Sequence, residues 1–267
     1  MFLALLRFRD ELYLPAISVR ERPRARDHFD QQFKPLFEAA HAARDAALEI
    51  RRLVSAHIDG IRTGQAICYG PNQYDILETI DIPLGQAVDK LVDQGVVAVK
   101  TGLQTILRDP LGVEIGFVFQ KDSAFDVGIA DLRATSQPEL ASYLCTVRAR
   151  WLSGFLQLRV DHEHGGWSLG GVHYRLTSPS SVSVVMPRVL GLPVDEFAQM
   201  SANWILLLVE NLMVYAMQKH SPSAIFVVEI PRESRDLMDP QRFRLAPGGL
   251  DPSPPWVISY ADESDFV

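Results

Sequence analysis

The amino-acid sequence predicts a mainly α-helical fold: a four-helix bundle with small β-hairpin inserts and an irregular C-terminal tail. Apolar residues recur at steps of three and four over four long stretches, the spacing that places them on one face of a helix. Prolines and glycines stand near the ends of these stretches, where they limit helices. We expect an N-terminal arm over residues 1–28, a helical domain with inserts over residues 29–220, and a C-terminal strand with a wrapping tail over residues 221–267.

The composition is that of an ordinary globular chain, neither disordered nor fibrous. Of 267 residues, 47% are hydrophobic and 22% are charged, which suffices for a large core. The net charge of -7 disfavours a protein that coats nucleic acid by charge alone. Residues 231–267 hold seven acids against four arginines, so the remaining chain is closer to neutral and a local nucleic-acid contact stays open. Cys68 and Cys145 form no CxxC pair, which suits a reducing cytoplasm, and we expect no metal and no cofactor.

The first two helices are predicted from their apolar period. Residues 1–28 show no sustained period and are interpreted as an irregular or short-strand arm, after which a helix runs from residue 29 to about Gly60. A second helix is predicted over residues 81–108 and stops at Asp109 and Pro110. Glycines weaken an isolated helix by about 1 kcal/mol each, so its two interior glycines indicate close approach of another helix. These two glycines are Gly95 and Gly102.

The second half of the chain is predicted to alternate hairpins and helices. Residues 113–119 and 125–129 are expected to form a small β-hairpin. A third helix begins at Pro138 and ends at Gly165 and Gly166. Residues 172–177 and 182–186 predict another hairpin, and residues 194–220 a fourth helix between two prolines. The most apolar stretch, residues 204–217, is shorter than the roughly 20 residues of a membrane-spanning helix, so we expect a location in the cytoplasm.

The densest polar cluster, Leu158–Trp167, lies where the third helix is predicted to end. It contains Arg159 and His164 in an R-x4-H spacing. An imidazole can take or give a proton near neutral pH, and a guanidinium can bind two oxygens of a phosphate. This pair can therefore cleave a phosphate ester without a metal ion. We expect Arg159 and His164 to be catalytic, with His162 and Glu163 orienting them.

This segment resembles the HEPN domains (higher eukaryotes and prokaryotes nucleotide-binding), in which an R-x4-6-H motif ends a long bundle helix. The resemblance rests on Arg159 and His164 in the context LRVDHEH and on the predicted four-helix core. It implies a metal-independent endoribonuclease that leaves 2′,3′-cyclic phosphate ends and acts in antiviral defence or in a toxin–antitoxin pair. It also implies a homodimer in which two motifs form one RNA-cleaving site, and a cognate antitoxin or defence partner.

Two further expectations concern RNA binding and the alternative to catalysis. Arg148 lies three helical turns before Arg159, so these two residues share a face and, with Arg150, could follow an RNA backbone; a solvated helix face is the alternative. The family often has Asn, Asp or His after the motif arginine, where this chain has Val160. This difference and the net charge favour a catalytically inactive HEPN-like scaffold or binding subunit of a larger complex as the alternative function.

Three other patterns in the sequence are weaker indications of a catalytic or metal site than the pair Arg159 and His164. A second R-x4-H copy, Arg52 and His57, lies on the first helix. Gly166–Gly170 matches G-x-S-x-G, but a nucleophile elbow follows a strand, and here a helix is predicted before it. His162 and His164 are two positions apart on a helix and point about 200° apart, which disfavours a shared zinc ion.

Overall fold

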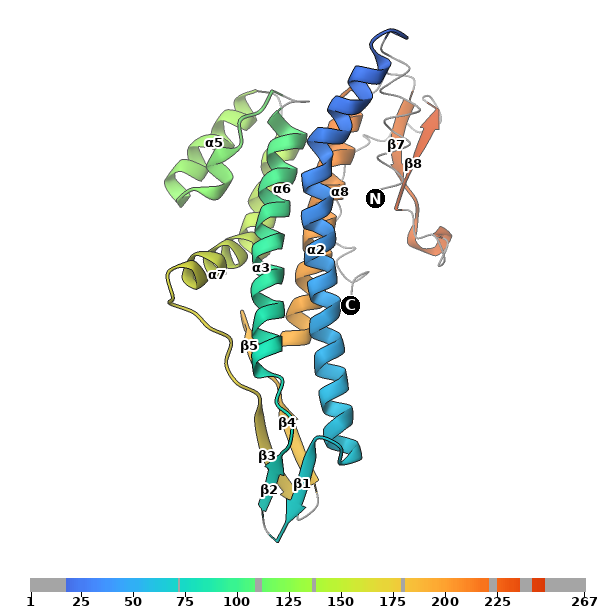
Figure 1. The fold of residues 1–267 in the computed structure, drawn as a ribbon. Helices are drawn as coiled ribbons and strands as arrows, with labels where there is room; N and C mark the ends of the chain where they lie inside the picture. The colour runs from blue at the N-terminus through green and yellow to red at the C-terminus, as the bar shows by residue number, and fades with distance from the viewer. Residues whose placement is uncertain are drawn as a thin grey trace. The chain divides into compact units, whose positions relative to one another are not determined.

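The protein is mainly helical, with small antiparallel β-hairpins between and after the helices (Figure 1). The computed structural model describes residues 18–71, 73–108, 112–135, 138–178, 181–220, 225–235 and 242–247. The helices in these ranges are α2 (Arg22–Thr63), α3 (Asp81–Leu103), α5 (Asp122–Ala134), α6 (Pro138–Val147), α7 (Ser153–Glu163) and α8 (Val194–His220).

Shorter helical turns extend or join these helices. A π-helical turn follows α3 directly, and a second one joins α6 to α7. The π-turns are η2 (Gln104–Arg108) and η4 (Arg148–Leu152), and the 3-10 turns are η3 (Gly116–Phe119) and η5 (Arg232–Ser234).

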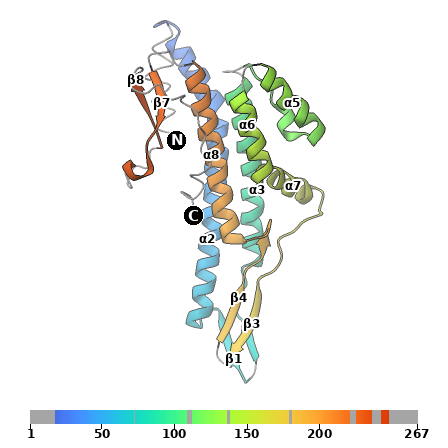
Figure 2. The same ribbon diagram turned by 180° about the vertical axis from the view of Figure 1, so that it is seen from behind.

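Eight strands pair as four separate antiparallel hairpins in the described part of the chain. In β3–β4, the register places His173 opposite Val185. In β7–β8, the register places Glu229 opposite Phe243. Figure 2 shows these two strands side by side. The hairpins are β1 (Ile67–Gly70) with β2 (Gln73–Ile76), β3 (His173–Ser178) with β4 (Ser181–Val185), β5 (Arg188–Val189) with β6 (Leu192–Pro193), and β7 (Ile225–Glu229) with β8 (Phe243–Pro247).

Contacts between Cα atoms divide the described residues into two units. Unit 1 consists of residues 18–37, 99–150 and 207–247, and unit 2 consists of residues 38–98 and 151–206, each with the gaps given above. Helices α2, α3 and α8 therefore contribute a segment to each unit. Both units have their own buried apolar residues, which stabilise them by roughly 1.5–3 kcal/mol for each large side chain removed from water.

The core of unit 2 is built where α3, α7 and α8 approach one another. A Cβ atom at Gly95 would lie 2.7 Å from Ile205 Cδ1 and 2.7 Å from Phe155 Cζ, so only glycine fits there without a shift. Phe155 stacks on Phe197 with ring centroids 6.4 Å apart, and both rings are fully buried. The predicted close helix approach at Gly95 is confirmed.

Unit 1 has a core of the same kind and a buried polar network beside it. A Cβ atom at Gly102 would lie 3.2 Å from Leu36 Cδ1 and 3.3 Å from Val209 Cγ2, which confirms the second predicted glycine contact. In the network, the Asn211 side-chain amide donates to Tyr143 Oη at 3.0 Å. Its oxygen accepts a hydrogen bond from the buried Arg242 guanidinium at 3.1 Å. This arginine also binds Glu229 at 2.9 Å and so ties β7–β8 to α8.

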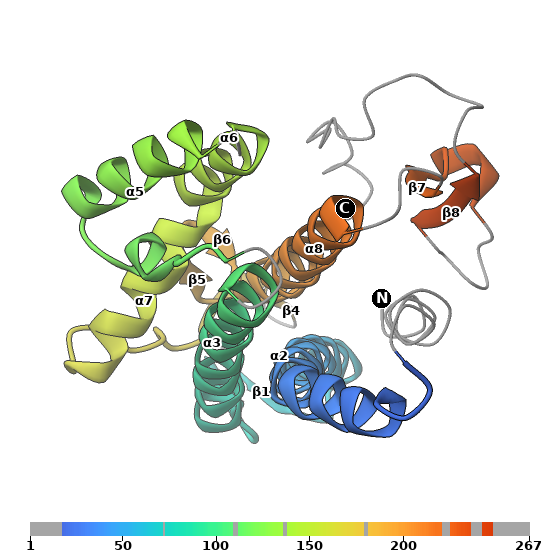
Figure 3. The same cartoon turned by 90° about the horizontal axis from the view of Figure 1, so that it is seen from above.

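The predicted hairpin over residues 113–129 is wrong. These residues form η3 and α5, which runs beside α6 (Figure 3). The ring of Phe117 packs on the bare face of α5 at Gly128, where a Cβ atom would collide with it, and this contact favours the helix. Phe125 and Ile129 are buried at a helical spacing on this same element.

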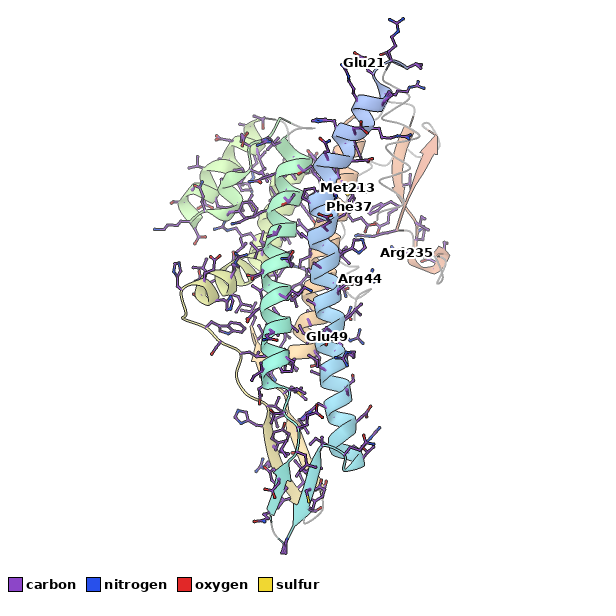
Figure 4. All side chains as sticks on the ribbon, in the orientation of Figure 1. Glu21, Phe37, Arg44, Glu49, Met213 and Arg235 are labelled. Atoms are coloured by element: carbon purple, nitrogen blue, oxygen red, sulfur yellow. The ribbon has the colours of Figure 1, made fainter. Side chains whose placement is uncertain are left out.

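The N-terminal boundary also differs from the prediction. Residues 22–28 belong to α2 and not to an irregular arm, while residues 1–17 lie outside the described part of the chain. The helix is preceded by Ser18 and Glu21, an S-x-x-E pattern typical of helix starts, and their side chains hydrogen-bond at 2.6 Å. Pro23 fits the first turn, where its missing N–H costs nothing. The first residues of α2 are shown with Glu21 labelled in Figure 4.

The remaining predictions of secondary structure are mostly confirmed. The α3, β3–β4 and α8 elements lie where the sequence places them, while β1–β2 and β5–β6 were not predicted. The predicted third helix is interrupted by η4. The C-terminal strand is the hairpin β7–β8, and the expected wrapping tail over residues 248–267 lies outside the described part.

The apolar segment of helix α8 is longer than the stretch considered in the sequence. Among the described residues, its segment Val194–Ala216 is long and apolar enough to cross a membrane by length and composition. Yet 61% of the most apolar window is buried inside the protein. Because a buried core helix has the same length and composition, this segment is weak evidence for a membrane.

Candidate active site

Helix α7 ends as the sequence predicts, at the two glycines. Gly165 has a φ of +67°, in the left-handed region that favours glycine. Its N–H donates to the His162 carbonyl at 3.1 Å, and the Gly166 N–H donates to the Asp161 carbonyl at 2.8 Å. These two bonds are those of a Schellman motif, with His164 as the capping residue. The polar residues of the motif therefore occupy the last turn of a well-terminated helix.

Arg159 is held by two carboxylates. Its Nε and Nη2 atoms donate to Glu163 Oε1 at 2.9 and 2.6 Å, within α7. Its Nε atom also lies 3.2 Å from Asp93 Oδ1 of α3. The side chain is 26% exposed, so these partners compensate a charge that is partly removed from water. Nη1 makes no hydrogen bond to any residue that the structure describes, which leaves one edge of the guanidinium available.

His162 is paired in the same way, one turn further along α7. Its Nε2 atom lies 3.2 Å from Asp89 Oδ1 of α3, and its ring meets the edge of Trp167 with centroids 6.3 Å apart. Asp89 and Asp93 are four residues apart on α3, and Arg159 and His162 are three apart on α7, so each pair shares a helix face. Two acids of α3 thus meet two basic side chains of α7.

His164 is not brought to Arg159. It is exposed at the C-cap of α7, where its backbone N–H donates to the Val160 carbonyl at 3.1 Å. Its side chain has no hydrogen bond, ion pair or ring contact with the described residues. Arg159 instead turns towards α3 and Glu163. Within one chain, the structure therefore joins Arg159 to Glu163 but leaves His164 apart.

The two predicted RNA-binding arginines lie before α7, in η4. Arg148 donates to the carbonyl oxygens of Val118 and Gln120, both at 2.8 Å, and binds Asp122 at 2.9 Å. Its side chain is only 13% exposed, so it fastens η3 to the start of α5. The prediction that Arg148 and Arg159 share one face assumed a continuous helix, and the π-turn η4 interrupts that helix between the two residues. Arg150 is exposed.

The second R-x4-H copy forms no site. Arg52 is paired with Glu49 at 2.6 Å on the surface of α2, where Glu49 is labelled in Figure 4. His57 is 4% exposed, and its Nε2 atom lies 2.7 Å from Tyr174 Oη of β3. Burial lowers the pKa of His57, although the carboxylate of Asp81 opposes this shift. These contacts are those of a structural histidine that docks β3 on α2.

No arrangement of three or more His, Cys, Asp or Glu side chains suited to a metal ion occurs among the described residues. Gly166–Gly170 follows α7 directly, without the preceding strand that a nucleophile elbow needs.

Asp89 and Asp93 are the site residues that sequence reasoning missed. The signal was their i,i+4 spacing on a helix predicted to be amphipathic, but nothing local indicates which helix they face.

No protein-family model, curated protein or solved structure matches this chain. The functional argument therefore depends on the end of α7 and on its partners in α3.

Proposed function

We propose that this protein is a HEPN-like, metal-independent endoribonuclease. The observation that carries the proposal is the last turn of α7, where Arg159, His162 and His164 stand within six residues at an accessible helix end. Phosphate ester cleavage needs a cation for the phosphate and an imidazole for proton transfer, and this turn holds both.

The proposed chemistry assigns one role to each motif residue. His164, exposed and unpaired among the described residues, takes the proton from the ribose 2′-hydroxyl. The free Nη1 edge of Arg159 binds the phosphate as its negative charge grows. Glu163 and Asp93 hold the opposite edge of the guanidinium and fix its direction. The products are a 2′,3′-cyclic phosphate and a 5′-hydroxyl.

The wider setting is part of the same proposal. The helices form a four-helix bundle of HEPN type, and the protein acts in the cytoplasm as a homodimer. Because Arg159 and His164 do not meet within one chain, a second copy supplies the missing partner of each in one composite site. The biological role is that of an effector in antiviral defence or in a toxin–antitoxin pair, under control of a cognate partner protein.

A second candidate function is a HEPN-like scaffold or binding subunit without catalysis. Its supporting observation is that Asp93 and Glu163 together compensate the charge of Arg159. A guanidinium held by two carboxylates binds a phosphate only by competing with them. Val160, exposed beside Arg159, adds no polar group to the site.

Cleavage of RNA in the presence of EDTA separates the two functions. Purified protein is incubated with single-stranded and structured RNA, and the ends of the products are mapped. His164→Ala should slow cleavage by about 10²- to 10⁴-fold, the usual contribution of proton transfer. Arg159→Ala should abolish phosphate stabilisation and slow cleavage as strongly.

Arg52→Ala and His41→Ala are matched controls. Arg52 is an exposed arginine, and like Arg159 it is paired with a glutamate in its own helix. His41 is an exposed histidine of α2. Both variants should cleave like the parent. If Arg159→Ala and His164→Ala also cleave like the parent, the catalytic proposal is wrong; if the parent cleaves no RNA, the scaffold function is favoured.

A further inference from the structure

Cleavage of RNA through the 2′-hydroxyl involves two proton transfers, one from the attacking oxygen and one to the leaving oxygen. His164 provides for one of them. On the basis of the proposed ribonuclease function, we infer that His162, positioned by Asp89, is the second proton-transfer group and protonates the leaving 5′-oxygen.

The first observation is the pairing of His162 with a carboxylate from another helix. Asp89 Oδ1 lies 3.2 Å from His162 Nε2, which leaves Nδ1 as the nitrogen that can face a substrate. The edge-on contact with Trp167, at an interplanar angle of 75°, restricts rotation of the imidazole ring. The side chain is 31% exposed, so substrate can reach it. A carboxylate that orients an imidazole is a recurring device of proton-transfer catalysis.

The second observation is the common direction of His162 and Arg159. Three residues along a helix correspond to about 300° of rotation, so their Cα–Cβ bonds point about 60° apart. Both side chains reach α3, where Asp89 and Asp93 receive them one turn apart. The guanidinium and this imidazole thus lie on one face of α7, whereas His164 lies at the cap.

The reaction balances with these groups. His164 removes the 2′-hydroxyl proton while the 2′-oxygen forms a bond to phosphorus. The bond from phosphorus to the 5′-oxygen breaks, and the His162 imidazolium gives its proton to that oxygen. Asp89 attracts the positively charged ring and does not take part in proton exchange with the substrate. Asp93 has the corresponding positioning role for Arg159.

A substrate with a bridging 5′-sulfur at the scissile position tests this assignment, because a thiolate leaves without being protonated. His162→Gln should slow cleavage of ordinary RNA by about 10²- to 10⁴-fold and cleave the 5′-thio substrate at nearly the parent rate. Asp89→Asn should show a smaller loss on ordinary RNA and the same rescue. His164→Gln should be slow on both substrates, because its proton transfer is still needed.

Asp59→Asn is the matched control, since Asp59 is an exposed helix carboxylate paired with a basic residue, Arg62. It should cleave both substrates like the parent, and circular dichroism should show that every variant is folded. If His162→Gln loses activity equally on both substrates, His162 has a structural role and the inference fails while the proposed function stands. If the parent cleaves neither substrate, the proposed function fails and this assignment falls with it.

Discussion

Replacing Gly95 with alanine tests the packing of α3 against α7 and α8 in unit 2. The added Cβ atom would lie 2.7 Å from both Ile205 Cδ1 and Phe155 Cζ. Carbon atoms in contact are normally about 3.5–4.0 Å apart, so two contacts become too short by about 1 Å. Phe155 is fully buried, and protein cores are close-packed, so its ring can shift only by displacing neighbouring side chains.

Two effects of opposite sign decide the free energy of unfolding of this variant. Alanine stabilises a helix interior by about 0.8–1.0 kcal/mol relative to glycine. Inserting a methyl group into a close-packed core costs about 1–3 kcal/mol. Because both colliding neighbours are core side chains, the packing cost exceeds the propensity gain, and Gly95→Ala should lose about 1 kcal/mol. For a chain of this size, that corresponds to about 2–4 °C in Tm.

Gly85→Ala is the matched control on the same helix. A Cβ atom at Gly85 meets no other atom within 4 Å, so this variant has the propensity gain alone and should be more stable than the parent. Urea unfolding followed by far-UV circular dichroism measures both variants, and the difference between them should be about 2 kcal/mol. Equal stability of Gly95→Ala and Gly85→Ala would refute the reasoning, because the close helix approach would then carry no cost.

Three further predictions concern buried or paired side chains. Burial holds the pKa of His57 below 6.5, so the unfolded chain binds the proton first as the pH falls. The free energy of unfolding should be full above about pH 6.5 and decline below it until the folded-state pKa is passed. His57→Gln should flatten this decline in urea titrations at several pH values. Arg148→Gln should lower the free energy of unfolding by about 1–3 kcal/mol in thermal unfolding, because the carbonyl oxygens of Val118 and Gln120 lose their donor. Unchanged stability would contradict the inference that Arg148 fastens η3 to α5. Arg242→Met should cost about 1–3 kcal/mol, because the Asn211 side-chain oxygen loses its donor while Glu229 keeps Arg235 as a partner. Amide exchange in β7–β8 should increase, and unaltered exchange there would show that Arg242 does not tie the hairpin to α8.

Much of the helical fold could be predicted because its signals are local. The bounds of α8 match the residues between Pro193 and Pro222, and the end of α7 follows from Gly165 and Gly166. Apolar period, proline and left-handed glycine act within one helix and are visible without tertiary structure. The glycine contact at Gly95 was predictable for a related reason, since an interior glycine in a helix needs an explanation from outside it.

By itself, the sequence determined where most helices begin and end, which hairpin lies between α7 and α8, and that Arg159, His162 and His164 share one short segment. Only the tertiary structure decided which partners these residues meet: Asp93 for Arg159, Asp89 for His162, and none for His164 among the described residues. The physical reason is that a residue pattern specifies the face of a helix but not the neighbour that covers it. Long-range packing chooses that neighbour, through contacts between residues distant in the chain.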